Sequence, residues 1–166
     1  DYRIYFARLS ASGAKIGSEI RLTSSYSVYP SLTWMGSEFG LGWSDRRDGN
    51  MEIYFSRLST QGAKIGNDVR LSFNPSYSDH VSLAWSGDRY GVSWYDNRDG
   101  NYEIYFNGIE ADGSGVGQEL RVTTDAANSA YPSLAGNGSE FGVSWREMRD
   151  GNEEIYFARV SGDGIK

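Results

Sequence analysis

The residues best suited to chemistry lie in a loop that occurs three times in this 166-residue chain. The first copy reads DRRDGNMEIYF from Asp45 to Phe55, and the later copies read DNRDGNYEIYF and EMRDGNEEIYF. Asp45, Asp48, Asn50 and Glu52 carry hard oxygen atoms of the kind that bind Ca²⁺. The loop therefore has to be weighed first as a calcium site.

The order of residues in this loop favours a structural hairpin over a calcium site. A calcium-binding EF-hand loop follows the pattern D-x-[DN]-x-[DN]-G. Here Arg47 stands where the second oxygen ligand should be, and Gly49 comes one position early. A guanidinium group inside an oxygen cage repels the cation. We therefore expect no metal and no cofactor, and calcium binding is kept as the alternative that chelation with EDTA tests.

The hairpin interpretation gives the same residues a role in the fold. Asp-Gly and Gly-Asn pairs supply the positive φ angles that a tight turn requires. Arg47 is expected to pair with Asp45 or with an acid of a neighbouring sheet, because a planar guanidinium matches a carboxylate. One exposed pair of this kind contributes about 0–1 kcal/mol. The predicted structural hairpin residues are Asp45, Arg47, Asp48, Asp96, Arg98, Asp99, Glu147, Arg149 and Asp150.

Catalytic side chains are scarce in this sequence. The single histidine, His80, stands where the other repeats have Tyr29 and Tyr131, so it replaces a repeated tyrosine. The chain has no cysteine and no recognisable histidine–acid–serine set, which argues against the usual nucleophilic catalysis. Carboxylates are plentiful, but no two of them stand out as a glycosidase pair. We therefore predict no catalytic residues and a protein that is not an enzyme.

The segments that differ most between the repeats are better candidates for recognition. They are Thr23–Pro30, Ser72–Val81 and Thr123–Pro132, and the repeats differ in length by two residues here. Variable loops on a constant scaffold are where binding usually resides. Their aromatic side chains can stack on a sugar or a peptide, or they can simply wedge between adjacent sheets, and both interpretations stay open. The candidate ligand-binding residues are Tyr26, Tyr29, Phe73, Tyr77, His80 and Tyr131.

All of these loops belong to a repeat of about 51 residues. The recurring positions are Asp48, Asp99 and Asp150, Trp43, Trp94 and Trp145, and the Ile-Tyr-Phe triplets that begin at Ile4, Ile53, Ile104 and Ile155. One repeat reads as four short strands, Pro30–Trp34, Phe39–Asp45, Glu52–Ser59 and Asn67–Ser72, which we name positions A, B, C and D. β-Branched and aromatic runs separated by Gly, Asn, Asp and Ser predict strands, and no long 3.6-residue apolar period predicts a helix.

Position B shows how the strands should pack. Phe39, Leu41 and Trp43 alternate with Gly40 and Gly42, so the large residues share one face and the tiny residues the other. A face of tiny residues suits a second sheet that presses against it. Small four-stranded antiparallel sheets that bury both faces against sheets like themselves are the blades of a β-propeller, and the period fits. We predict an all-β fold of about three blades plus one extra strand.

The predicted strands form a single repeat array over residues 1–166. It consists of a partial blade 1–24, blades 29–72 and 80–124, and a partial blade 131–166. Propellers typically close with about 4–8 blades, and an open arc exposes strand edges and blade faces. We therefore expect self-association, with a homodimer completing a six-bladed ring, or a longer parent chain that supplies further blades.

Bulk properties argue against two classes of partner. A net charge of −6 with dispersed Lys and Arg argues against nucleic acid. No apolar run approaches the roughly 20 residues of a membrane span, so we expect no membrane insertion. An acidic chain rich in Tyr, Ser, Asn and Gly is typical of secreted or cell-surface proteins, and we expect that location.

The repeat also resembles a known group of proteins. Its pattern W-x-D-x-R-D-G-N-x-E-I-Y-F, followed by a G-x-E-x-R-L-T-like strand and Y-P-S-L-x-W, is similar to repeats of TolB-like and related bacterial and archaeal surface β-propellers. The resemblance covers essentially the whole chain and implies the fold rather than an activity. The sialidase motif S-x-D-x-G-x-x-W and the Gly-His…Trp-Asp signature of WD-type repeats are absent. We expect a non-enzymatic binding or scaffold module for a glycan or a protein; the alternatives are a fragment of an extracytoplasmic hydrolase-type propeller and a purely structural repeat module without a ligand.

Overall fold

The computed structural model describes residues 2–115 and 117–163, and the only regular secondary structure within these ranges is β-strand. The described residues form thirteen strands, the number expected from the repeats. They contain no helix that is long and apolar enough to cross a membrane. The prediction of an all-β fold is confirmed.

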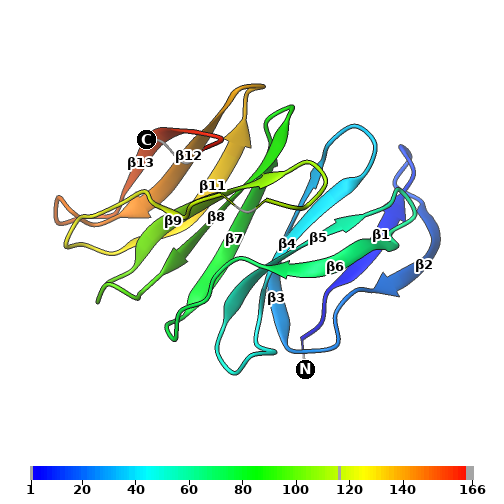
Figure 1. The fold of residues 1–166 in the computed structure, drawn as a ribbon, viewed down its shortest axis with the longest axis horizontal. Helices are drawn as coiled ribbons and strands as arrows, with labels where there is room; N and C mark the ends of the chain where they lie inside the picture. Colours follow the sequence, from blue (N-terminus) through cyan, green and yellow to red (C-terminus); the bar gives the residue numbers. More distant parts are fainter. Residues whose placement is uncertain (1, 116, 164–166) are drawn as a thin grey trace.

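The strands form four antiparallel sheets in which positions A to D follow one another in order. A first, two-stranded sheet holds positions C and D as β1 (Tyr5–Leu9) and β2 (Lys15–Arg21). Blade 1 is complete and consists of β3 (Ser27–Trp34), β4 (Phe39–Asp45), β5 (Glu52–Leu58) and β6 (Lys64–Arg70). These two sheets are neighbours at one end of the molecule (Figure 1).

The remaining strands continue the same pattern. Blade 2 is complete, with β7 (Ser78–Trp85), β8 (Arg89–Asp96), β9 (Glu103–Glu110) and a short β10 (Leu120–Arg121). Blade 3 has positions A to C as β11 (Ser129–Gly136), β12 (Glu140–Glu147) and β13 (Glu154–Ser161). The sheets stand side by side from β2 on the right of Figure 1 to β13 on the left, and the A strands of adjacent blades contact each other.

The tiny face of position B lies against the next blade. A Cβ atom on Gly40 would lie 2.5 Å from Cε1 of Tyr90, and one on Gly91 would lie 2.5 Å from Cε1 of Phe141. Real Cβ atoms do not approach other atoms so closely, so an aromatic ring of the following blade fills the space where a side chain would otherwise be. The packing predicted from the alternation of large and tiny residues is confirmed.

Hydrophobic cores therefore lie between the blades. One core joins the first sheet to blade 1 through Ile4, Phe6 and Trp43, among others. The core between blades 1 and 2 comprises Ile53, Phe55, Leu71, Val81, Leu83, Tyr90, Val92, Trp94, Tyr105 and Ile109. The core between blades 2 and 3 comprises Ala84, Ile104, Phe106, Val122, Phe141, Val143, Trp145 and Val160. Burial of these apolar side chains is the main force that holds the blades together.

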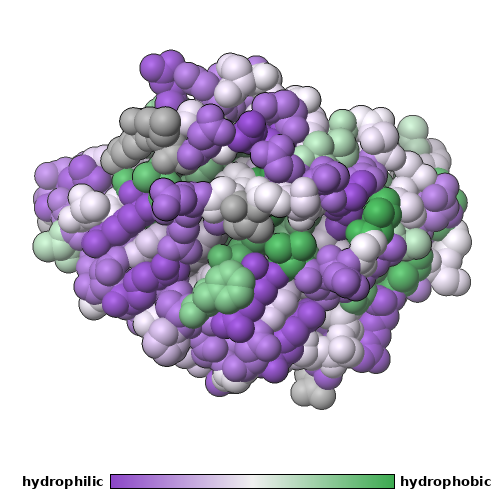
Figure 2. All heavy atoms as spheres, viewed as in Figure 1, coloured by the Kyte–Doolittle hydropathy of each residue, from purple (hydrophilic) through white to green (hydrophobic). Residues whose placement is uncertain are grey.

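Polar side chains dominate the surface. Hydrophilic residues cover most of the face seen in Figure 2, and hydrophobic residues reach the surface in separate patches between them. The larger exposed hydrophobic side chains include Tyr29, Trp34, Tyr131, Ile155 and Phe157. These exposed residues define the two surfaces considered below.

Candidate functional site

The repeated hairpin loop is filled by its own hydrogen bonds. The buried carboxylate of Asp45 accepts bonds from the Trp43 indole at 2.9 Å and from both Arg47 Nε and Nη2, at 3.0 and 2.8 Å. Burial acts to raise the pKa of Asp45, but these bonds outweigh it and hold the pKa below its usual value. Both oxygens of this carboxylate are thus already engaged by hydrogen-bond donors, the Arg47 guanidinium among them.

The arginine–carboxylate pair recurs in the other two blades, although the buried indole N–H of Trp94 in blade 2 has no hydrogen-bond partner among the described residues. Arg98 Nη2 donates to the buried Asp96 at 2.8 Å, and Arg149 Nε donates to the buried Glu147 at 2.6 Å. Each arginine also lies over the tyrosine of the Ile-Tyr-Phe triplet, as Arg47 does over Tyr54 with 4.2 Å to the ring centroid. The hydroxyls of these tyrosines donate to the aspartates of the loop; the three pairs are Tyr54–Asp48, Tyr105–Asp99 and Tyr156–Asp150.

Of the two partners expected for Arg47, the structure shows Asp45 and, among the described residues, no acid of a neighbouring blade. The second acid bound by Arg47 is Asp68 on β6, with 2.9 Å between Nη1 and Oδ2, so both partners belong to the same blade and none to a neighbouring one. The side chain of Asp45 is fully buried rather than exposed. Its ion pair is therefore a partly buried one, to which the small value for exposed pairs does not apply.

A second group of residues forms a row along the innermost strands. Tyr29 on β3, His80 on β7 and Tyr131 on β11 occupy equivalent positions, and we call them the inner-strand aromatic row. Their φ angles are 52°, 53° and 56°, which is the left-handed region that side-chain-bearing residues rarely adopt. Each lies at a shift in strand register, so the strand bulges at this point. Strained backbone of this kind is characteristic of functional sites.

The row is continuous from blade to blade. The rings of Tyr29 and His80 are stacked, with centroids 3.7 Å apart, and Tyr131 meets His80 edge-on with centroids 4.9 Å apart. The hydroxyl of Tyr95 lies 2.9 Å from His80 Nδ1, and the Arg146 guanidinium lies 4.6 Å from the centroid of the Tyr131 ring. Burial lowers the pKa of His80, and the nearby Asp79 carboxylate offsets this only in part.

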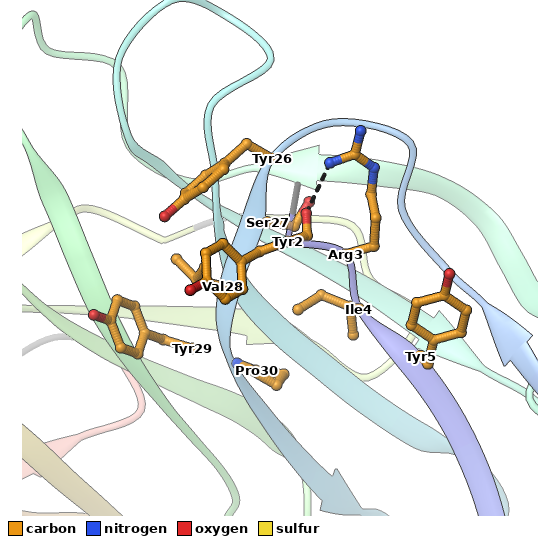
Figure 3. Close-up of a pocket in the computed structure, with 9 residues that line it drawn as sticks. All are labelled: Tyr2, Arg3, Ile4, Tyr5, Tyr26, Ser27, Val28, Tyr29 and Pro30. Carbon is orange, nitrogen blue, oxygen red and sulfur yellow. Dashed lines mark hydrogen bonds between the residues drawn. The ribbon is translucent and has the colours of Figure 1, made fainter.

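Two open pockets meet at this row. The smaller, of about 240 Å³, is lined by the row and by Pro30, Val81 and Pro132. The larger, of about 460 Å³, lies between the segment around β1 and the start of β3. Figure 3 shows the rings of Tyr2, Tyr26 and Tyr29 on one side of the larger pocket and Arg3 and Tyr5 on the other.

The structure brings four of the six candidate binding residues together. Tyr29, His80 and Tyr131 form the row, and Tyr26 lines the larger pocket beside it. Phe73 and Tyr77 line neither pocket. Phe73 is 73% exposed beside the Arg70 guanidinium, and the Tyr77 hydroxyl accepts a bond from Arg46.

Sequence reasoning missed several residues of this surface. Tyr2 stands two residues before the first Ile-Tyr-Phe triplet, as Tyr102 does before the third, and this repetition was an available signal. Tyr95 and Arg146 occupy the same place in two repeats, directly after the repeated tryptophan. Their side chains differ between repeats, so no repeated pattern marked them.

Comparison with known proteins supports the fold. No protein-family model and no curated protein matches this sequence. Among solved structures, the chain is similar to a protein described as TolB from Agrobacterium tumefaciens, with 16% identity and a TM-score of 0.56 over 96% of this chain and 58% of that one.

Two further solved structures show the same likeness. A neuraminidase-like protein from a little yellow-shouldered bat isolate matches with 13% identity and a TM-score of 0.64 over 89% of this chain and 44% of that one. A Bacillus subtilis arabinanase matches with 16% identity and a TM-score of 0.51 over 96% and 64%. The chain thus spans about half to two thirds of the length of these proteins. The likeness confirms the β-propeller fold that the repeats predicted.

Proposed function

We propose that this chain is a non-enzymatic binding module that holds a carbohydrate along its inner-strand aromatic row. The observation that carries the proposal is the row itself. Three aromatic side chains recur at one position of three consecutive blades, on backbone that costs about 1–3 kcal/mol at each residue. Strain of this kind clusters at functional sites, which supports a surface shaped for a ligand.

The chemistry of the row fits a neutral sugar. A sugar ring has an apolar C–H face and a rim of hydroxyl groups, and tyrosine offers an apolar ring with a hydroxyl at its tip. Tyr29 and Tyr131 are 46% and 50% exposed, so their rings and hydroxyls are both accessible. Equivalent positions in successive blades also give a repeating surface, which suits a polymer of repeating units.

The hydrolase alternative has less support from the residues present. Glycosidases generally use two carboxyl groups that flank the scissile bond. Among the described residues that line the two pockets there is no aspartate or glutamate. The repeated acids Asp45, Asp96 and Glu147 instead accept hydrogen bonds from tryptophan, serine and arginine side chains. An arabinanase shares the fold, but a shared fold does not transfer a reaction.

Calorimetric titration with a panel of neutral oligosaccharides tests the proposal. Tyr29→Ala and Tyr131→Ala should each weaken binding about tenfold, which corresponds to about 1.4 kcal/mol. Phe73→Ala is the matched control and should leave binding unchanged, because Phe73 is exposed but lines neither pocket. Melting curves of all three variants establish that they remain folded.

The possible results separate the three functions. Binding that both tyrosine substitutions leave intact would place the ligand elsewhere and overturn the proposal. Release of reducing sugar from the same panel would favour the hydrolase alternative. If no member of the panel binds, the carbohydrate proposal fails and the purely structural interpretation gains ground.

A further inference from the structure

The end of the blade array at β13 is missing a contact that recurs inside the molecule. Within the array, the phenylalanine of each position C packs on an aromatic ring of the next position B. The three pairs are Phe6–Phe39, Phe55–Tyr90 and Phe106–Phe141, with ring centroids 5.7, 4.9 and 5.3 Å apart. The fourth such residue, Phe157 on β13, is 66% exposed, and Ile155 beside it is 76% exposed. Phe157 on β13 is therefore the position C phenylalanine without an aromatic contact of this kind among the described residues.

A second contact, a hydrogen bond between the inner strands of adjacent blades, also recurs inside the array and is missing at its ends. The backbone N–H of Leu83 donates to Ser31 Oγ of the preceding blade at 3.0 Å, and that of Leu134 donates to Ser82 Oγ at 2.9 Å. Ser133 is the next acceptor in this series, and the N–H of Leu32 is the first donor. Among the described residues, neither of them makes a bond of this kind. Leu32 and the neighbouring Trp34 are 48% and 46% exposed.

The larger pocket lies where two strands would complete the first sheet. In blades 1 and 2, position C pairs along its inner edge with position B, as β5 does with β4 and β9 with β8. The sheet of β1 and β2 has only positions C and D. The space beside the inner edge of β1, lined by residues around Ile4 and Val28, is the pocket of about 460 Å³ in Figure 3. An unpaired strand edge is a site for strand addition.

We propose that two copies of this chain close into a six-bladed ring by exchanging a strand. In this ring β12 of one copy pairs with the inner edge of β1 of the other, beside the larger pocket, so that β1 takes the place of β13 along β12 and β11 lies next to β12 as before. Both β1 and β13 are position C, so they cannot occupy this place together. Each copy then contributes twelve of its thirteen strands, and each composite blade consists of β11 and β12 of one copy with β1 and β2 of its partner.

The burial of side chains on β1 and β13 indicates which of these two strands is displaced from β12. Ile4 and Phe6, in and just before β1, are 5% and 7% exposed, because this strand is anchored in the core against blade 1. Ile155 and Phe157 on β13 are mostly exposed, and Val160 is the one buried residue among those described in β13, where it belongs to the core between blades 2 and 3. The backbone ladder along β12 is the same with either strand, since the repeat register is the same. Exchange therefore keeps the ladder and adds burial where β11 of the partner covers Leu32 and Trp34 on β3.

Charge favours β1 over β13 at one position. The residue before the Ile-Tyr-Phe triplet is acidic in three repeats and is opposite an acid of position B, as Glu154 is opposite Glu147. In the first repeat the same position is Arg3. Exchange thus replaces a pair of like charges across the strands with a pair of opposite charges, which is the more stable arrangement. No arginine among the described residues forms an ion pair with Glu154.

The ring would also complete the inner-strand aromatic row. Tyr131 of one copy would be followed by Tyr29 of its partner, so that six aromatic residues line the axis instead of three. The pocket beside β1 is consumed by the exchange, whereas the row remains accessible. The proposal of ring closure and the proposal of carbohydrate binding can therefore be tested, and can fail, independently of each other.

The test uses the absence of cysteine from the chain. In the exchanged ring Ser10 of one copy lies opposite Glu140 of the other, in the place that Ser161 holds in the structure described here. Paired residues on adjacent strands are close enough for a disulfide. A chain carrying Glu140→Cys, mixed with a chain carrying Ser10→Cys, should form a disulfide-linked dimer under mild oxidation. Ser59→Cys is the control for Ser10→Cys, because Ser59 occupies the same repeat position inside complete blade 1.

Native mass spectrometry supplies the oligomeric state. We expect a dimer, twice the chain mass of 18.4 kDa, that persists at about 1 µM. A chain that ends at Glu153, and so lacks β13, should still dimerise and cross-link. Arg3→Glu should weaken dimerisation about tenfold, because the change acts at both composite blades, whereas Lys15→Glu on the outer strand should not.

Each alternative result overturns the proposal. A folded monomer at this concentration, or a series of open-ended oligomers, would exclude the closed ring. A dimer that cross-links with the control but not with Ser10→Cys would exclude strand exchange. Loss of the dimer on removal of β13 would show that β13 holds the copies together.

Discussion

The imidazole of His80 lies on the ring of Tyr29 with 3.7 Å between ring centroids and 26° between ring planes, although the two residues belong to different blades. The stack joins adjacent inner strands at their strained positions. Replacement of the repeated tyrosine by histidine in blade 2 thus places the only imidazole of the chain between two tyrosines. We therefore expect the contact between these blades to depend on pH.

Stability should therefore fall as the solution is made mildly acidic. Burial lowers the pKa of His80 below its ordinary value of 6.5, against the opposing influence of Asp79. Below that ordinary value the unfolded chain binds a proton that the folded chain resists, so the free energy of unfolding decreases as pH falls. Urea unfolding between about pH 7.5 and 5.5 measures this slope. His80→Tyr, which restores the residue of the other repeats, should flatten it, and an unchanged slope would contradict the assignment to His80.

Loss of the hairpin arginine should destabilise the protein. Arg47→Ala leaves the buried Asp45 carboxylate without its bidentate partner, and we expect the free energy of unfolding to fall by about 2–3 kcal/mol. Arg46→Ala is the matched control. Arg46 is the next residue in the chain, and its exposed guanidinium donates only to the Tyr77 hydroxyl, at 3.3 Å. Denaturant unfolding measures the free energy of unfolding of both variants. An equal decrease in the two would show that the Arg47–Asp45 ion pair does not stabilise the protein.

The tiny face of strand B should tolerate no added side chain. A Cβ on Gly91 would lie 2.5 Å from the Phe141 ring of blade 3, so Gly91→Ala should lower stability by about 1–3 kcal/mol. Ser93→Ala, on the same face of β8, removes a buried hydroxyl that has no hydrogen-bond partner among the described residues. Its melting temperature should stay the same or rise. A stable Gly91→Ala variant would mean that the blades can separate at little cost.

Calcium and its removal should leave the protein unchanged. The carboxylates of the repeated loop face arginine, tyrosine and serine donors, as Asp48 faces the Tyr54 hydroxyl and Arg70. A cation would have to displace a guanidinium to bind there. Melting curves with EDTA and with added CaCl₂ should coincide. A lower melting temperature in EDTA would restore the calcium interpretation of the loop.

Much of the architecture follows from patterns that are local in the chain. The two-residue alternation of Phe39, Leu41 and Trp43 with glycine predicts a strand buried on both faces, because side chains of a strand point to opposite sides in turn. The fixed place of Asp48-Gly49-Asn50 between two strands predicts a hairpin rather than a metal loop. Repetition of both patterns predicts the blades, and the structure contains them.

Contacts between strands, within a blade and between blades, were not predictable in the same way. The partner of Arg47 on β6, the meeting of Tyr29, His80 and Tyr131, and the place of Tyr95 beside the imidazole depend on residues brought together by sheet packing. Gly136, which replaces a repeated tryptophan, is explained only by packing, since a Cβ there would lie 2.3 Å from the Trp85 carbonyl oxygen. None of these relations follows from the residues next to them in the chain.

The sequence by itself determined the strands, the hairpins and the face that each strand buries, because turn chemistry and side-chain alternation act over a few neighbouring residues. The tertiary structure decided which aromatic residues share a surface and which blade faces are covered. Those outcomes depend on how the twisted sheets pack against one another. A row such as Tyr29, His80 and Tyr131 exists only after residues about 51 positions apart have been placed on adjacent inner strands.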